Sequence, residues 1–162
     1  SLTEERKMKV LTRLFCASIG ASLVLTVPAR ADYVLYLAGM PLTCANYAGT
    51  PVDFSFDTSL ADVGMAFTGA TPPRVVFNPI VMNSYSPLMQ LFWWGHECAH
   101  HNVGGNESAA DCFAIKSMKN RGMSPVGLNE LQAQVLALAG DGSGHLPGPL
   151  RAMHFAACYY SL

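Results

Sequence analysis

The chain is organised around one stretch, Trp93-Trp94-Gly95-His96-Glu97-Cys98-Ala99-His100-His101, which contains the pattern His-Glu-x-x-His. On a helix, His96 and His100 are one turn apart and project from the same face, so both imidazoles can reach one ion. Two imidazoles and one carboxylate bind Zn²⁺ and leave a fourth position for water, whose pKa falls to about 7. Glu97 is then the expected general base and acid. The pattern predicts a hydrolytic zinc site.

A third protein ligand is expected shortly after the motif. Gly104-Gly105 can end the first helix, and Asn106 can cap a second helix that begins with Glu107. Glu107 is therefore the predicted third metal ligand. Asp111 follows one turn later on the same face, where it can accept the free ring N–H of a ligating histidine, most plausibly that of His96.

A different interpretation of the same motif is a coincidental pair of histidines on a solvated helix, because the bare pattern also occurs by chance. An apolar helical run before the motif, a glycine turn after it and the Glu-x-x-x-Asp pair beyond argue against coincidence. A disulfide-stabilised scaffold without metal remains a separate hypothesis, under which His96→Ala would change neither metal content nor stability.

The His-Glu-x-x-His segment, together with Asn-Glu-Ser-Ala-Ala-Asp-Cys-Phe-Ala at residues 106–114, resembles the gluzincin metallopeptidases. Within them it is most similar to the group that includes HtpX and the CAAX prenyl proteases, in which a Glu-x-x-Ala-Asp helix supplies the third ligand. The resemblance covers roughly residues 86–151 and includes a Gly-x-x-Pro turn that begins at Gly122. It implies a zincin-like helical region and a zinc-dependent peptidase, an endopeptidase acting on protein or peptide substrates.

The same resemblance gives roles to two residues near the C-terminus. Enzymes of this group carry a His-Pro element with an arginine six residues after the histidine, and His145 with Arg151 matches that spacing, although Leu146 separates His145 from the proline. By this resemblance His145 stabilises the oxyanion and Arg151 supports it. The return from His100 to Glu107 is shorter than is usual in the group. A non-proteolytic envelope or interaction protein that retains the zinc site is therefore the alternative function.

The N-terminal region is typical of a secretory signal peptide. A positively charged segment starts at Met8, an apolar run covers residues 14–27, and an A-x-A site ends at Ala31. We therefore expect residues 1–31 to be an N-terminal extension plus a signal peptide cleaved after Ala31, with an uncleaved anchor as the alternative. Residues 32–162 form one metallopeptidase-like domain, exported to the periplasm or secreted, with no stable membrane insertion after cleavage.

Charge and cysteine content bear on partners and compartment. Residues 32–162 carry five basic and nine acidic side chains, a net charge of −4, which argues against a nucleic acid partner. Their four cysteines predict two disulfides in an oxidising compartment, with three possible connectivities. We prefer Cys98–Cys112 with Cys44–Cys158. Cys98 as a zinc ligand is disfavoured because it points away from the face shared by His96 and His100.

The secondary-structure pattern indicates an α+β fold in which a small N-terminal antiparallel sheet precedes a helical region with the motif helix at its centre. Predicted strands are residues 33–37, 52–56, 63–67 and 74–77. Residues 74–77 are the candidate for an edge strand next to the motif helix that binds substrate backbone. The alternative is an ordinary core strand, which is the role we favour for its side chains.

Four helices are expected after the strands, and their starting signals are Ser86-Pro87, Asn106, Ser124-Pro125 and Pro149. The last helix carries His154, to which we assign a structural role.

Overall fold

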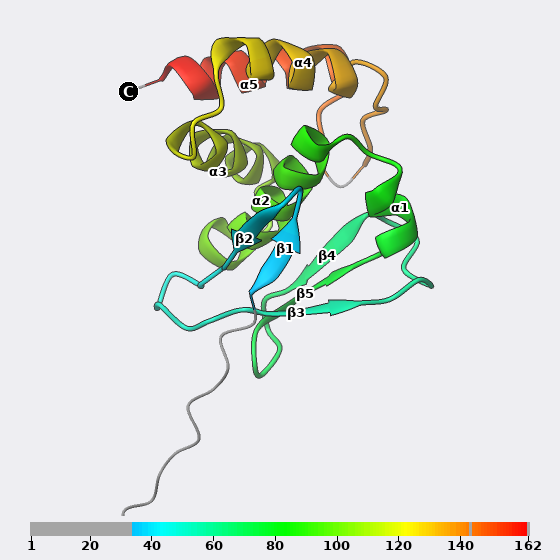
Figure 1. Cartoon of the computed structure of the whole chain (residues 1–162), viewed down its shortest axis with the longest axis vertical. Coiled ribbons are helices and arrows are strands. Elements are labelled where there is room, and N and C mark those ends of the chain that lie inside the picture. Colours follow the sequence, from blue (N-terminus) through cyan, green and yellow to red (C-terminus); the bar gives the residue numbers. More distant parts are fainter. Residues whose placement is uncertain (1–33, 143, 162) are drawn as a thin grey trace, which may run out of the picture. The chain divides into compact units, whose positions relative to one another are not determined.

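The computed structural model describes residues 34–142 and 144–161 (Figure 1). The expected signal peptide, its start at Met8 and its cleavage after Ala31 lie outside the described residues.

Five short strands precede most of the helical part of the chain. Their bounds are β1 Leu35–Leu37, β2 Met40–Leu42, β3 Asp53–Phe56, β4 Gly64–Phe67 and β5 Arg74–Phe77. Four of them lie within or close to the predicted ranges, whereas β2 was not expected because Pro41 resembles a turn residue. Among the described strands, β2 pairs only with β1 and so has one unpaired edge. Proline is tolerated in such a strand because its missing N–H need not remove a hydrogen bond between strands.

The strands form two small sheets, one a β1–β2 antiparallel hairpin and the other three-stranded in the order β3–β5–β4. β4 is antiparallel to β5, as predicted, but β3 runs parallel to β5. The prediction that residues 74–77 provide the edge strand beside the motif helix is wrong. β5 is the central strand with both edges paired, and β4 is the edge strand that packs against the motif helix.

The helices of the described chain follow the strands and are α1 Pro79–Asn83, α2 Pro87–Val103, α3 Glu107–Asn120, α4 Pro125–Val135 and α5 Gly148–Tyr160. The predicted N-caps are present. Ser86, Asn106 and Ser124 each accept a backbone N–H of the first turn of the helix that follows. Such caps are worth about 1 kcal/mol each, which explains why local sequence located these helix starts.

Helix α2 lies at the centre of the core. It packs against α3, against β4 and against β1 and α4 (Figure 1). Its buried side chains include Phe92, Trp93 and Trp94. A Cβ at Gly95 would lie 3.2 Å from the Cα and Cβ of Ala114, so small residues let α2 and α3 approach closely. The expected α+β architecture with a central motif helix is therefore present.

The cysteines form two disulfides, but the preferred pairing is wrong. Cys44 pairs with Cys98 and Cys112 pairs with Cys158, with Cα–Cα distances of 5.8 and 5.1 Å. The reason is helical geometry: Cys98 is about 200° around α2 from His96, whereas α3 lies on the His96 side. Two disulfides are consistent with export to an oxidising compartment. Within residues 34–142 and 144–161, no helix has the length and apolar character needed to cross a membrane.

Candidate metal centre

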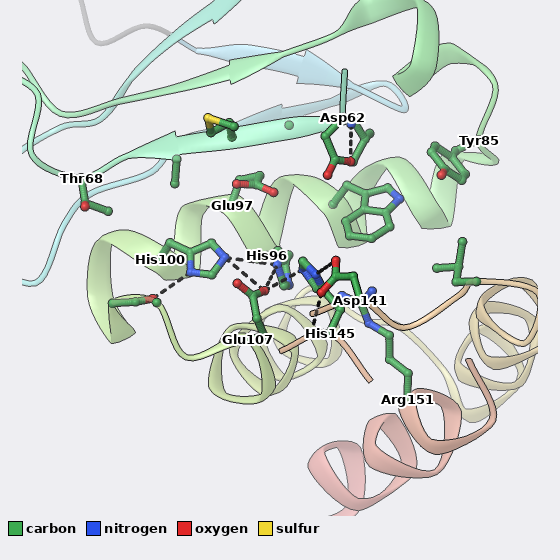
Figure 2. Close-up of a pocket in the computed structure, with 18 of the residues that line it drawn as sticks. Asp62, Thr68, Tyr85, His96, Glu97, His100, Glu107, Asp141, His145 and Arg151 are labelled. Atoms are coloured by element: carbon green, nitrogen blue, oxygen red, sulfur yellow. Dashed lines mark hydrogen bonds and ion pairs between the residues drawn. The ribbon is translucent and has the colours of Figure 1, made fainter. Parts of the chain in front are cut away.

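Three predicted ligands converge where α2 ends and α3 begins (Figure 2). His96 Nε2 lies 3.2 Å from His100 Nε2 and 3.0 Å from Glu107 Oε2, and His100 Nε2 lies 3.6 Å from that same oxygen. Gly104, with φ of 68°, ends α2, and Asn106 caps α3, so Glu107 is brought back to the histidines within one tight return. The short spacing between His100 and Glu107 is therefore compatible with convergence.

Hydrogen bonds orient both imidazoles toward the point of convergence. His96 Nδ1 lies 2.8 Å from Asp111 Oδ1, and His100 Nδ1 lies 2.7 Å from the carbonyl oxygen of Gly104. Both partners are acceptors, so in the neutral form of each ring Nδ1 carries the hydrogen and Nε2 keeps its lone pair. Such outer hydrogen bonds are the usual means of fixing the tautomer of a metal-binding histidine.

The donor geometry fits zinc. In a tetrahedral site with metal–ligand distances of about 2.0–2.1 Å, neighbouring donor atoms lie about 3.3 Å apart, and the observed spacings of 3.0, 3.2 and 3.6 Å bracket that value. Glu107 Oε2 is buried and faces the Nε2 atoms of His96, His100 and His145. Lone pairs that face one another across such a gap repel unless a cation lies between them, so the donor set is suited to a metal ion.

A proton is the alternative cation at this position. Burial opposes a charged His96 imidazole, but hydrogen bonds to Asp111 and Glu107 outweigh burial and raise the pKa of His96 to about 9. Burial likewise tends to raise the pKa of Glu107, yet its contacts with His96, His145 and His100 hold it below the usual range. The negative charge around His96 therefore favours a cation, whether a proton or a metal ion.

Asp111 joins the first histidine to the C-terminal helix. Arg151 of α5 donates to both Asp111 oxygens, from Nε at 2.8 Å and Nη2 at 2.6 Å, and both side chains are only 2% exposed. Burial favours the neutral acid, but the bonds from His96 and Arg151 prevail and lower the pKa of Asp111. The Arg151 guanidinium also lies 4.9 Å from the Trp93 ring centroid. Arg151 is thus a positioning residue that acts on His96 through Asp111.

Glu97 lies between α2 and the edge strand β4 (Figure 2). Burial raises the pKa of Glu97, and positive charge on His96 or His100 would lower it. A Cβ at Gly64 would be 2.8 Å from Glu97 Cγ, so glycine in β4 makes room for this side chain. A buried carboxyl group with a raised pKa beside a metal-type donor set has the properties of a general base.

His145 approaches the same cluster from the loop between α4 and α5. Its Nε2 lies 2.8 Å from Glu107 Oε2, and its Nδ1 lies 2.6 Å from Asp141 Oδ2. His96, Glu107 and His145 are close enough together to hold one ion. Asp141 therefore serves His145 as Asp111 serves His96, except that Asp141 is half exposed.

A cleft of about 450 Å³ opens over these residues. Its walls are β4, α2, the glycine turn before α3 and the loop that carries His145 (Figure 2). Asp62 and Tyr85 lie on its β4 side, where Figure 2 places them apart from the histidine cluster. The cleft gives a solute access to the donor atoms and to Glu97.

The structure thus brings together every predicted site residue except Arg151, which reaches the cluster only through Asp111. Two contributors were missed by sequence reasoning. Asp141 stands four residues before His145, a spacing that could have drawn attention to it, but it lies in a glycine-rich loop where no helix predicts a contact. Gly64 interrupts a strand pattern, which is a known signal for close approach of another group.

Comparison with protein-family models, with curated proteins and with solved structures finds no match.

Proposed function

We propose that the chain is an exported zinc-dependent peptidase, with His96, His100 and Glu107 as metal ligands and Glu97 as general base and acid. The observation that carries this proposal is the facing set of three donor atoms, spaced 3.0 to 3.6 Å apart and oriented by outer hydrogen bonds. The buried carboxylate of Glu97 beside them adds the proton acceptor that amide hydrolysis needs.

A bound zinc ion supplies Lewis-acid activation of water and of the scissile carbonyl. Glu97 takes a proton from the attacking water and later gives it to the leaving amine. Burial raises the pKa of Glu97, which makes its carboxylate a better proton acceptor than an exposed one. His145 is the proposed hydrogen-bond donor to the developing oxyanion, and Asp141, with Oδ2 at 2.6 Å from His145 Nδ1, holds the ring in place.

The substrate class follows from the edge strand. β4 uses one edge for β5, and no described strand pairs with its other edge. An extended peptide that adds to that edge would run over Glu97 along the cleft wall. Main-chain hydrogen bonds to β4 would hold such a peptide with little dependence on its side chains, so we propose protein segments in extended conformation as substrates.

The test is zinc analysis of the purified protein beside hydrolysis of unfolded casein. We expect one tightly bound zinc and cleavage that a chelator abolishes. Glu97→Gln should retain the zinc and reduce cleavage about 10²–10⁴-fold. Glu130→Gln is the matched control, because Glu130 is exposed on α4, away from the cleft. Zinc binding with no cleavage of casein or of an unstructured peptide library, unchanged in Glu97→Gln, would contradict the proposal.

His145 also favours a second candidate, a non-proteolytic zinc-binding envelope protein. If His145 Nε2 is a fourth ligand beside His96, His100 and Glu107, the site becomes closed, as structural zinc sites are. The 2.8 Å approach to Glu107 Oε2 supports this arrangement.

His145→Ala separates the two candidates. If His145 donates to the oxyanion, the variant keeps its zinc affinity and loses cleavage. If His145 is a fourth ligand, zinc affinity falls and the vacated position leaves cleavage unchanged or increased.

A further inference from the structure

A second group of metal-type donors lies between α3 and α5, outside the cleft. His154 Nε2 is 3.6 Å from Cys112 Sγ and 3.5 Å from Cys158 Sγ. Cys112 comes from α3, whereas His154 and Cys158 are one turn apart on α5 and share a face. We propose that these three residues form a second zinc site in the thiol form of the protein, interchangeable with the Cys112–Cys158 disulfide.

The distances support this assignment. With Zn–S of about 2.3 Å and Zn–N of about 2.0–2.1 Å, tetrahedral geometry places a nitrogen about 3.5 Å from a neighbouring sulfur. His154 Nε2 already has this separation from both sulfurs. Once the sulfurs are no longer bonded, only their mutual separation must change. A water can then complete the coordination.

The chemistry balances with a dithiol as the reductant. The dithiol transfers two electrons and two protons, the Sγ–Sγ bond breaks, and the dithiol becomes its own disulfide. Zn²⁺ then binds two thiolates and displaces their two protons. His154 Nε2 now donates to the carbonyl of Ser108 at 2.8 Å, so metal binding requires its hydrogen to move to Nδ1 through solvent. The Cys112–Cys158 disulfide and a bound zinc ion are therefore alternative ways of joining α3 to α5.

The other disulfide provides an internal comparison. Cys44 and Cys98 belong to no group of three metal-type donors in the part of the chain that the structure describes. Cys112 and His154 are partly exposed, while Cys158 is 2% exposed. A reductant and an ion can therefore reach the Cys112 side of the cluster, and reduction of Cys44–Cys98 should create no comparable site.

The experiment measures zinc bound by the folded protein before and after reduction with a trialkylphosphine. The phosphine breaks each disulfide and becomes its oxide, taking oxygen from water. We expect one additional zinc per chain after reduction. Cobalt(II) in place of zinc should give the intense thiolate-to-cobalt charge-transfer absorption only in the reduced protein. Because the measured quantity is the increment, it does not depend on whether the cleft binds zinc or cleaves peptides.

Three variants decide the assignment. Cys44→Ser/Cys98→Ser should keep the increment, whereas Cys112→Ser/Cys158→Ser should abolish it. His154→Ala, which keeps both disulfides in the oxidised protein, should weaken the second zinc by more than the roughly 10–100-fold expected for an outer partner. Absence of the increment in reduced protein that retains its circular dichroism spectrum overturns the proposal. An additional zinc that persists in Cys112→Ser/Cys158→Ser also overturns it. The same holds if His154→Ala binds the additional zinc with unchanged affinity.

Discussion

The protein has two clusters of metal-type donors, one where α2 meets α3 and one between α3 and α5. They differ in how the repulsion between neighbouring donor atoms can be relieved. His96, His100 and Glu107 bring together three donor atoms that have no covalent way to relieve their repulsion. The sulfurs of Cys112 and Cys158 can bond to each other instead.

On the two proposals above, the first cluster binds an ion with the help of outer hydrogen-bond partners, whereas the second binds one only when its disulfide is reduced. Asp111 holds His96 in place and Arg151 holds Asp111, all nearly inaccessible to solvent. His154 is held by one backbone carbonyl, that of Ser108. The predictions below test how far the two clusters are independent.

The largest effect is expected from His96→Ala. Loss of a ligand whose side chain is 1% exposed should remove zinc from the oxidised protein altogether, because even the loss of an outer partner costs about 10–100-fold in affinity. Metal content after dialysis measures this. His154→Ala is the control and should retain the zinc. Equal zinc content in the two oxidised variants would show that the first cluster is not the metal site.

Asp111→Ala should destabilise the fold by about 3–5 kcal/mol, because it leaves Arg151 as a buried charge without its partner. Urea unfolding measures the change. Asp141→Ala removes the equivalent acceptor of His145, but at a half-exposed position, and should cost less than about 1 kcal/mol. Similar losses in both variants would mean that burial does not distinguish the two histidine supports.

Removal of either disulfide should lower stability by about 2–4 kcal/mol. The two bridges close loops with sequence separations of 54 and 46, and loop entropy changes only slowly with length. Cys44→Ser/Cys98→Ser and Cys112→Ser/Cys158→Ser should therefore unfold at nearly the same urea concentration. A difference above about 1 kcal/mol would reveal that one bridge does more than close a loop.

Apart from the control variants, the smallest effect is expected from Gly64→Ala, at about 1–3 kcal/mol. The new methyl group would meet Glu97 Cγ at 2.8 Å and the Phe77 ring at 2.9 Å. Gly69→Ala is the matched control, since nothing lies within 4 Å of its Cβ position. The thermal unfolding midpoints of both variants measure the loss of stability. Casein cleavage is measured as well, at a temperature at which both variants are folded. If Gly64→Ala behaves like Gly69→Ala, β4 is not packed against Glu97 as described.

Local signals were enough to predict much of the site. The one-turn spacing of His96 and His100 determines their shared face, and the caps at Ser86 and Asn106 determine where α2 and α3 begin. Glu107 and Asp111 could be found because they follow a glycine turn on a capped helix. These features depend on contacts between residues that are near in sequence.

Features that depend on distant contacts could not be predicted in the same way. Strand order depends on pairing between segments that are distant in sequence, so the prediction gave β5 the edge position that β4 occupies. The cysteine pairing depends on how α2 and α3 rotate against each other, and the preferred choice ignored that Cys98 faces away from α3. Asp141 reaches His145 only because a loop folds back, and a loop has no periodicity that would predict it.

One consequence follows from the contiguity of α2 and α3. His96, His100, Glu107 and Asp111 belong to a single helical hairpin, and closing so short a loop costs little entropy. If the ligand trio of His96, His100 and Glu107 binds an ion as proposed, it can do so during synthesis, before the residues that form α5 have left the ribosome. On that proposal the contact of Arg151 with Asp111 forms last, so a truncated chain lacking α5 should bind zinc more weakly than the full chain.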